Sequence, residues 1–463
     1  MKSVYTKAGN AGGSAQTRWL VTVLFFAGLL NFADRAIFSV LAQTIKADLK
    51  LSDLELGLLQ GLLFALLYGL AGLPVGMLAE RMRRTSLISA ALVIWSMATA
   101  ATGVATGFVQ LAMARLVVGF GEAGFTPAAA SLVADVAPPR RRSSMIALVQ
   151  LGSPAGAFLG ATIAGAIASV SSWRISFVAF AIPGFLVAAI LHWLVAEPAR
   201  GQQDPPASTS AEAPSLGNFL STLRGSPTLC WVIAGGSLAG FGMTSISQFL
   251  AVFLARTYSL KVGEAAALFG TISGIALTIG LLAGSFGTDR LSARDPRWPA
   301  WGAAIGLTLA PPLYWLAFAG PSLPVATAIL LVAGAMLLVF YGPTSGLIQN
   351  LLPTRMRATG IALYTLLYTL IGSGLGPVFV GGMSDLFAAR AYPGNFQVDC
   401  PKGLPLPGAG ASAVEACRAA SAGGLQVAMS AALAVLFVAA ICFMRAARGL
   451  KRELDQTPDQ SSA

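Results

Sequence analysis

The sequence predicts an all-α polytopic membrane protein in which twelve transmembrane helices form two pseudo-symmetric six-helix bundles. Three observations support this fold class: the composition, a series of long apolar stretches, and two loop sequences that occur twice. Of the 463 residues, 56% are hydrophobic and only 11% are charged, whereas a soluble domain carries about 25% charged residues to hydrate its surface. The outer surface is therefore expected to face lipid.

A helix that crosses the bilayer needs about 20 mainly apolar residues. The stretches that meet this length cover residues 19–42, 55–79, 86–107, 108–135, 143–169, 174–196, 228–254, 264–288, 299–319, 322–350, 358–386 and 423–444. The division near residue 107 depends on a Gly/Thr-rich stretch rather than on a charged loop. No cleavable signal is expected, because the first apolar run begins only at Trp19, contains charges and is too long.

The net charge of +11 would suggest nucleic-acid binding in a soluble protein. In a membrane protein it follows from the enrichment of Lys and Arg in cytoplasmic segments. With both termini placed in the cytoplasm, the cytoplasmic segments hold most of the 30 Lys and Arg residues. We therefore expect an even number of spans, two cytoplasmic termini and no nucleic-acid partner.

The expected organisation is an N-terminal six-helix bundle at 1–196, a cytoplasmic linker at 197–225, a C-terminal six-helix bundle at 226–446 and a cytoplasmic tail at 447–463. The linker begins with a Pro/Ser/Ala-rich segment that has no apolar periodicity. The halves also share sequence. DVAPPRRRSSMIAL (135–148) matches NLLPTRMRATGIAL (350–363), and GMLAER (76–81) matches SFGTDR (285–290) more weakly. Repeated halves are the usual construction of secondary transporters.

These loops resemble motifs of the major facilitator superfamily. GMLAERMRR (76–84) is similar to its loop signature G-x-L-a-D-R-x-G-R-[KR], with Glu80 in place of Asp and Arg83 in place of the second Gly. Asp135 and Arg142 match its acidic-x6-Arg motif. In the matching segment of the second half, Asn350 stands in place of the acid. The resemblance implies a cytoplasmic charge latch, which it assigns to Gly76, Glu80, Arg81, Arg84, Asp135, Arg142, Asp289 and Arg290.

A narrower resemblance is to the spinster branch of that superfamily. It rests on NFADR (31–35) in span one and RLVVGFGEA (115–123) in span four. Animal members of the branch export lysolipids and sphingosine phosphate. The resemblance implies a monomeric bacterial homologue in the inner membrane that carries an amphiphilic small molecule by alternating access.

Four charged residues fall within predicted spans and away from their ends: Asp34, Arg35, Arg115 and Glu122. A charge at the centre of a spanning helix costs roughly 2.5–3.5 kcal/mol, so these side chains are expected to face water or to pair with each other. Arg115 and Glu122 share one face of their helix because they are seven residues apart. We expect Arg35 to bind an anionic group and Glu122 or Asp34 to carry a proton. The alternative is a purely structural cluster of ion pairs, which contributes little net stability.

The second half has no matching charges and offers polar and aromatic side chains instead. With Asn31 of span one, the candidates for lining a cavity are Thr244, Gln248, Tyr341, Thr344, Tyr364 and Tyr368. Taken singly, each of them is better explained by an interhelical hydrogen bond or a packing contact. Asp385, at the end of span eleven, and His192, in span six, are interpreted as interfacial residues.

The sequence has no phosphate-binding Gly-x4-Gly-Lys-Ser/Thr loop, no Cys/His cluster for a metal and a single His. We therefore expect no cofactor, no metal and no enzymatic activity. The expected function is proton-coupled transport of an anionic amphiphile, such as a lysolipid or a sphingolipid-like molecule. The alternative is proton-coupled transport of small polar organic anions or drugs. Cys400 and Cys417 share the longest outer loop, where a disulfide can form if that side is oxidising.

Overall fold

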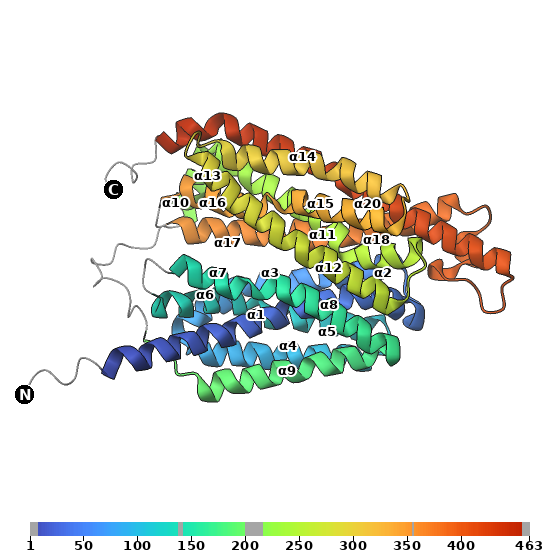
Figure 1. Cartoon of the computed structure of the whole chain (residues 1–463), viewed down its shortest axis with the longest axis horizontal. Coiled ribbons are helices and arrows are strands. Elements are labelled where there is room, and N and C mark those ends of the chain that lie inside the picture. Colours follow the sequence, from blue (N-terminus) through green and yellow to red (C-terminus); the bar gives the residue numbers. More distant parts are fainter. Residues whose placement is uncertain (1–7, 138–141, 200–215, 354–355, 456–463) are drawn as a thin grey trace, which may run out of the picture. The chain divides into compact units, whose positions relative to one another are not determined.

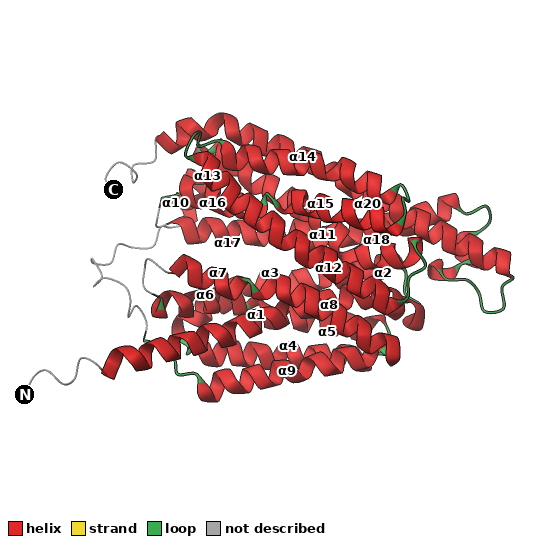
Figure 2. Ribbon diagram, in the orientation of Figure 1, coloured by secondary structure: helices red, strands yellow, loops and turns green. Residues whose placement is uncertain are grey.

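The computed structural model describes residues 8–137, 142–199, 216–353 and 356–455. All regular structure in these residues is helical (Figure 2). It contains 12 helices that are long and apolar enough to cross a membrane, and each one overlaps one of the predicted stretches. The loop at residues 105–107 separates two of them, so the expected division near residue 107 is confirmed. The predicted fold class is correct.

Several spans of the first half consist of two helices joined at a local break. Its helices are α1 (Ala8–Leu49), α2 (Asp53–Gln60), α3 (Leu62–Arg81), α4 (Arg84–Val104), α5 (Phe108–Ala123), α6 (Phe125–Val136), α7 (Arg142–Gln150), α8 (Gly152–Val170) and α9 (Trp173–Leu194). The breaks fall at Gly61, Gly124 and Leu151. Glycine favours such breaks because it costs a helix about 1 kcal/mol relative to alanine.

The second half contains two π-helical segments, a form that appears mostly as short interruptions of α-helices. Its elements are α10 (Leu216–Gly225), α11 (Pro227–Thr257), α12 (Val262–Leu282), η2 (Ala283–Gly287), α13 (Thr288–Ser292), α14 (Trp298–Phe318), α15 (Leu323–Leu338), α16 (Tyr341–Leu351), α17 (Arg357–Leu367), η4 (Tyr368–Leu375), α18 (Gly376–Ala391), α19 (Phe396–Asp399), η5 (Pro401–Gly403) and α20 (Ala411–Asp455). The last helix therefore extends into the expected tail.

The chain divides into two compact units. Unit 1 contains residues 1–38 and 66–210, and unit 2 contains residues 39–65 and 211–463. The division does not follow chain order, because the segment 39–65, which connects spans one and two, packs with the C-terminal helices. The predicted boundaries of the linker and the tail stay predictions, and residues 200–215 and 456–463 lie outside the described residues.

In unit 1, α4 packs along α5 and α9, and α8 also contacts α9 (Figure 1). Trp95 on α4 is almost fully buried and packs edge-on against Phe125 of α6, with their ring centroids 6.3 Å apart. Large aromatic side chains bury much apolar surface in this arrangement. This packing fixes the positions of α4 and α6, which carry the polar residues described below.

In unit 2, α11 is the central helix and contacts α12, α16, α18, α20 and η4. A second layer of contacts joins α14 to α15 and α20, and α18 to α2 (Figure 1). Cys400 and Cys417 form a disulfide with their Cα atoms 5.8 Å apart, which ties the α19–η5 loop to α20. The pairing left open by the sequence is therefore present.

Candidate functional site

The main polar contact of unit 1 joins α1 to α5. Arg35 donates from Nε and Nη2 to the same oxygen of Glu122, Oε2, at 2.9 and 2.8 Å. The Glu122 side chain is fully buried, whereas that of Arg35 is 27% exposed. Oε1 of Glu122 is buried and has no hydrogen-bond partner among the described residues. A carboxylate with one engaged and one unengaged oxygen can accept a further donor or a proton.

Asp34 and Arg115 complete the charged cluster. Asp34 is buried and accepts a hydrogen bond from Thr99 of α4 at 2.7 Å. Arg115 is also buried, and its guanidinium lies 4.6 Å from the ring centroid of Phe38. It interacts electrostatically with both Asp34 and Glu122. The structure therefore brings the four predicted charges together in one unit, with two carboxylates balancing two guanidinium groups.

Two aromatic rings lie beside the Arg35 guanidinium. Its guanidinium carbon lies 5.4 Å from the ring centroid of Phe32 and 5.0 Å from that of Tyr68. Rings at this distance stabilise a cation, and the Tyr68 hydroxyl also interacts with the Arg35 side chain. Asn31, one turn before Arg35, is buried beside Glu122.

The predicted residues of unit 2 fall into two groups. Thr244 donates to Gly372 O at 2.7 Å, Thr344 donates to Phe340 O at 2.6 Å, and Gln248 accepts a hydrogen bond from Ser39. The bonds of Thr244 and Gln248 are interhelical, as the alternative interpretation expects, whereas the bond of Thr344 lies within its own helix. The three tyrosines form a separate aromatic cluster.

The tyrosine cluster contains Tyr341, Tyr364 and Tyr368. The Tyr368 ring centroid lies 6.3 Å from that of Tyr341 and 5.8 Å from that of Tyr364. Tyr341 is 40% exposed, whereas Tyr364 is buried and its hydroxyl has no hydrogen-bond partner among the described residues. A buried hydroxyl without a partner costs about 1–3 kcal/mol. The cluster therefore combines an apolar surface with a hydrogen-bonding group that the described residues do not use.

A second ion cluster of unit 1 is centred on Arg84, one of the predicted latch residues. Arg84 is buried at the start of α4 and forms ion pairs with Asp135 at the end of α6 and with Glu197 after α9, the latter at 2.8 Å. It also donates to Ser131 at 2.9 Å. This network holds the ends of three helices together.

Glu197 was not predicted as a latch residue, although an acid directly after a predicted span is a visible signal. Both the N–H and the hydroxyl of Thr85 donate to it, each at 2.9 Å. Burial opposes ionisation of this carboxyl, but the Thr85 and Arg84 hydrogen bonds outweigh it and hold the pKa of Glu197 below its usual range.

The other latch candidates are not joined to this network in the described residues. Arg81, Asp289 and Arg290 are exposed, and Gly76 lies in α3 with open space beside it. The side chains of Glu80 and Arg142 lie outside the described residues. The latch prediction therefore rests on Arg84 and Asp135.

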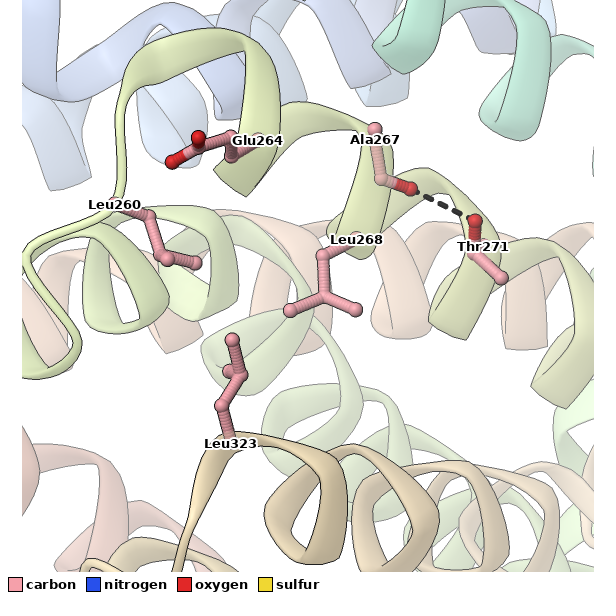
Figure 3. Close-up of a pocket in the computed structure, with 6 residues that line it drawn as sticks. All are labelled: Leu260, Glu264, Ala267, Leu268, Thr271 and Leu323. Atoms are coloured by element: carbon pink, nitrogen blue, oxygen red, sulfur yellow. Dashed lines mark hydrogen bonds between the residues drawn. The ribbon is translucent and has the colours of Figure 1, made fainter.

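Unit 2 also has an open groove of about 550 Å³ between the starts of α12 and α15 (Figure 3). It is lined by Leu260, Glu264, Ala267, Leu268, Thr271 and Leu323. The Thr271 hydroxyl is used within the helix, donating to Ala267 O at 2.8 Å. None of the predicted site residues lines this groove. Among the described residues, no group of three or more His, Cys, Asp and Glu side chains is arranged to hold a metal.

A family comparison identifies the chain. Residues 24–377 match the model of the Major Facilitator Superfamily. The chain belongs to this superfamily. It is 31% identical to a bacterial homolog of the human lysosomal transporter Spinster, whose crystal structure is inward-facing and unoccupied; the match covers 95% of this chain and 98% of that one, with a TM-score of 0.86. The predicted relationship to the spinster-like branch is confirmed.

The names of two curated relatives describe different transporters, and only the second name gives a substrate. An MFS-type efflux pump of Mycolicibacterium smegmatis is 32% identical over 366 residues, which is 79% of this chain and 84% of that protein. A hexuronate transporter of Bacillus subtilis is 29% identical over 285 residues, which is 60% of this chain and 66% of that protein. This chain is therefore a multi-pass membrane protein of a transporter superfamily. The names of its relatives do not identify its substrate.

Proposed function

We propose that this superfamily transporter is a proton-coupled secondary carrier of an anionic amphiphile, such as a lysolipid or sphingolipid-like molecule. In this proposal Glu122 carries the proton and Arg35 binds the anionic group. Asp34 and Arg115 set the charge of the surrounding site. The contact between Arg35 and Glu122 is the observation that carries the proposal.

The charge balance of the cluster supports coupling. With both carboxylates ionised, Asp34 and Glu122 balance Arg35 and Arg115, so a buried site of this kind has no net charge. A proton on the unengaged Oε1 of Glu122 would leave one positive charge in excess. Because an uncompensated charge inside a membrane is costly, the protonated site favours a single anionic group beside Arg35.

The partial exposure of Arg35 supports its role in binding. It is the member of the cluster with the most accessible side chain, at 27%, and the rings of Phe32 and Tyr68 lie beside it. A guanidinium group presents parallel N–H donors that match the oxygens of a phosphate or carboxylate. Its release from Glu122 would therefore provide an anion site with apolar surroundings.

The tyrosine cluster of unit 2 favours an amphiphile over a purely polar substrate. Its three rings belong to α16, α17 and η4, and the neighbouring stretch of α11 from Pro227 to Leu254 contains no charged residue. Rings of this kind are suited to an apolar chain with a few hydrogen-bonding groups.

A second candidate is transport of a small polar organic anion. The name of the Bacillus subtilis relative favours it, and the unused Tyr364 hydroxyl could bond a substrate hydroxyl. The same Arg35–Glu122 pair would bind the anionic group of either substrate. The two candidates therefore differ in the side chains that contact the rest of the substrate.

The proposed topology is a monomer in a bacterial inner membrane with both termini in the cytoplasm. The Cys400–Cys417 disulfide supports the placement of its loop outside, and so of the termini inside, because disulfides persist on the oxidising side of a membrane. The Arg84–Asp135–Glu197 network would then be the cytoplasmic latch.

Reconstitution into liposomes tests the proposal. Wild-type protein is expected to move a fluorescent lysolipid faster than protein-free liposomes do, and a pH gradient should raise the rate. Arg35→Ala should lower the rate at least about tenfold because it removes a charged pairing group. Arg418→Ala, at an exposed position, is the matched control. Movement of glucuronate but not of the lysolipid would support the second candidate, and movement of neither above the blank would contradict both.

A further inference from the structure

Asp53, the first residue of α2, is a buried carboxylate that the functional assignment does not use. Its side chain is 2% exposed and forms an ion pair at 2.6 Å with Lys46 of α1, whose side chain is 1% exposed. The first predicted span ends at residue 42, so the sequence alone would place Lys46 in a loop, where a lysine is hydrated. Instead the ammonium group lies inside unit 2.

Asp53 also pairs with Arg256, at the end of α11. The Arg256 guanidinium donates to Oδ2 at 2.7 Å and to Oδ1 at 2.6 Å, while its Nε donates to Gln43 at 2.8 Å. Ser384 of α18 adds a hydrogen bond to Oδ2 at 2.6 Å. Both carboxylate oxygens thus have two donors each, which is the geometry a buried charge requires.

Asp385 of α18 also contacts the start of α2. Its carboxylate accepts hydrogen bonds from Asp53 N at 3.2 Å and Leu54 N at 2.9 Å, where a helix start has unpaired N–H groups. Asp385 thus pairs with N–H groups at the start of α2, next to the N-cap Ser52, a contact that the sequence did not predict.

The helices themselves approach closely at this point. A Cβ atom at Gly57 would overlap the backbone of Pro377, and one at Gly381 would overlap the backbone of Asp53. Backbones in membranes come this close only through small residues. Residues 39–65 therefore pack tightly against α18, and the Asp53–Arg256 pair joins them to α11.

The disulfide-bonded loop covers the cluster. Lys402 forms an ion pair at 3.0 Å with Glu55, and Ser421 donates to Gly403 O at 3.0 Å. Gly403 lies directly against Lys46: a Cβ there would be 3.1 Å from Nζ. The loop thus keeps water away from the Lys46–Asp53 pair.

Residues 39–65, which Asp53 holds within unit 2, begin in α1 and end in α3, and both helices continue into unit 1. α1 enters the segment at Ser39, and α3 leaves it after Ala65. We propose that Asp53, with Lys46 and Arg256, is a gate at the disulfide-bearing end of the protein, and that residues 39–65 separate from α11 and α18 when this end opens. This inference rests on the proposed function, because only an alternating-access cycle requires the separation.

Hydrogen exchange measured by mass spectrometry tests whether Asp53 holds the segment, and it needs no substrate. Asp53→Asn keeps the shape of the side chain but removes the negative charge that pairs with the buried Lys46 and Arg256. Amides in 39–65 should then exchange about tenfold faster or more, with little change elsewhere in unit 2. Glu55→Gln is the control, because its pair with Lys402 is partly exposed and such pairs contribute little.

Ser384→Ala provides a milder variant if Asp53→Asn folds poorly. It removes one of the four hydrogen bonds and should raise exchange in 39–65 by a smaller factor. Unchanged exchange in 39–65 in both variants would overturn the assignment, as would an increase spread evenly over unit 2.

Cross-linking tests whether the contact must open during transport. A Cβ at Gly382 lies 3.5 Å from Leu54 Cδ1, so Leu54→Cys with Gly382→Cys is expected to form a disulfide on oxidation. The background carries Cys230→Ser and Cys442→Ala, which remove the two free cysteines. Oxidation should stop transport and a reductant should restore it, while the single-cysteine proteins stay active. Undiminished transport by the fully cross-linked protein would overturn the gate; absence of transport by wild type would instead count against the proposed function.

Discussion

Arg35 donates two hydrogen bonds to one oxygen of Glu122 and none to the other, which has no hydrogen-bond partner among the described residues. Asp53 provides a contrast, because each of its oxygens receives two donors. A carboxylate surrounded on both oxygens is stabilised as an anion, whereas one with a free oxygen can take up a proton there. The two buried acids are therefore suited to different tasks, a fixed tie at Asp53 and a proton carrier at Glu122.

Arg35→Lys tests the need for a planar cation. Lysine keeps the charge but cannot place two N–H groups on one carboxylate oxygen and two on a substrate with the same geometry. We expect the KM for the anionic substrate to rise about tenfold or more while the protein stays folded. Transport kinetics in liposomes provide the measurement, and a KM equal to that of wild type would contradict the role of Arg35.

Tyr364→Phe separates substrate binding from folding. Its hydroxyl is buried without a partner in the described residues, so its removal should leave the melting temperature unchanged or raise it. If the hydroxyl bonds the substrate, affinity should fall about fivefold to tenfold. Thermal unfolding and substrate binding are measured on the same preparation. A lower melting temperature with unchanged affinity would mean that Tyr364 has only a structural role.

Glu197→Gln tests the Arg84 network through pH. The pKa of Glu197 is held below its usual range by the Thr85 and Arg84 hydrogen bonds despite burial, so the folded protein favours the ionised form. Its contribution to stability is present above the unfolded pKa of about 4.3 and is lost as the pH falls through the lower folded pKa. The variant should melt a few degrees below wild type at pH 7, and the difference should shrink toward pH 3. A pH-independent difference would contradict this explanation.

The disulfide predicts the number of reactive thiols. Protein purified without reductant and alkylated after unfolding should show two modified cysteines, Cys230 and Cys442, and four after reduction. Mass spectrometry gives the count directly. Four modified cysteines before reduction would show that the loop at 400–417 is reduced in the native protein.

The helices and the charged cluster could be predicted from sequence because both follow from the cost of placing polar groups in lipid. Long apolar stretches mark the spans, and a charge within such a stretch, such as Arg35 or Glu122, requires a partner. The sequence did not reveal which acid pairs with which arginine, because helix neighbours and rotations depend on tertiary packing.

The Asp53 cluster could not be predicted in the same way. Lys46 and Arg256 lie near the ends of spans, where charges are ordinarily hydrated, and Asp385 has the same position in span eleven. Their burial depends on the close packing of α2 against α18, which brings together residues over 300 positions apart in the chain. Only a three-dimensional structure shows such a contact.

The central claim is that Glu122 carries the coupled proton, and Glu122→Gln tests it most directly. The amide keeps the size of the side chain but cannot take up a proton at physiological pH. In liposomes the variant should still exchange substrate across the membrane at equal pH, yet a pH gradient should no longer drive accumulation. Glu264→Gln in the open groove is the matched control and should respond to the gradient as wild type does. Full gradient-driven accumulation by Glu122→Gln would contradict the claim.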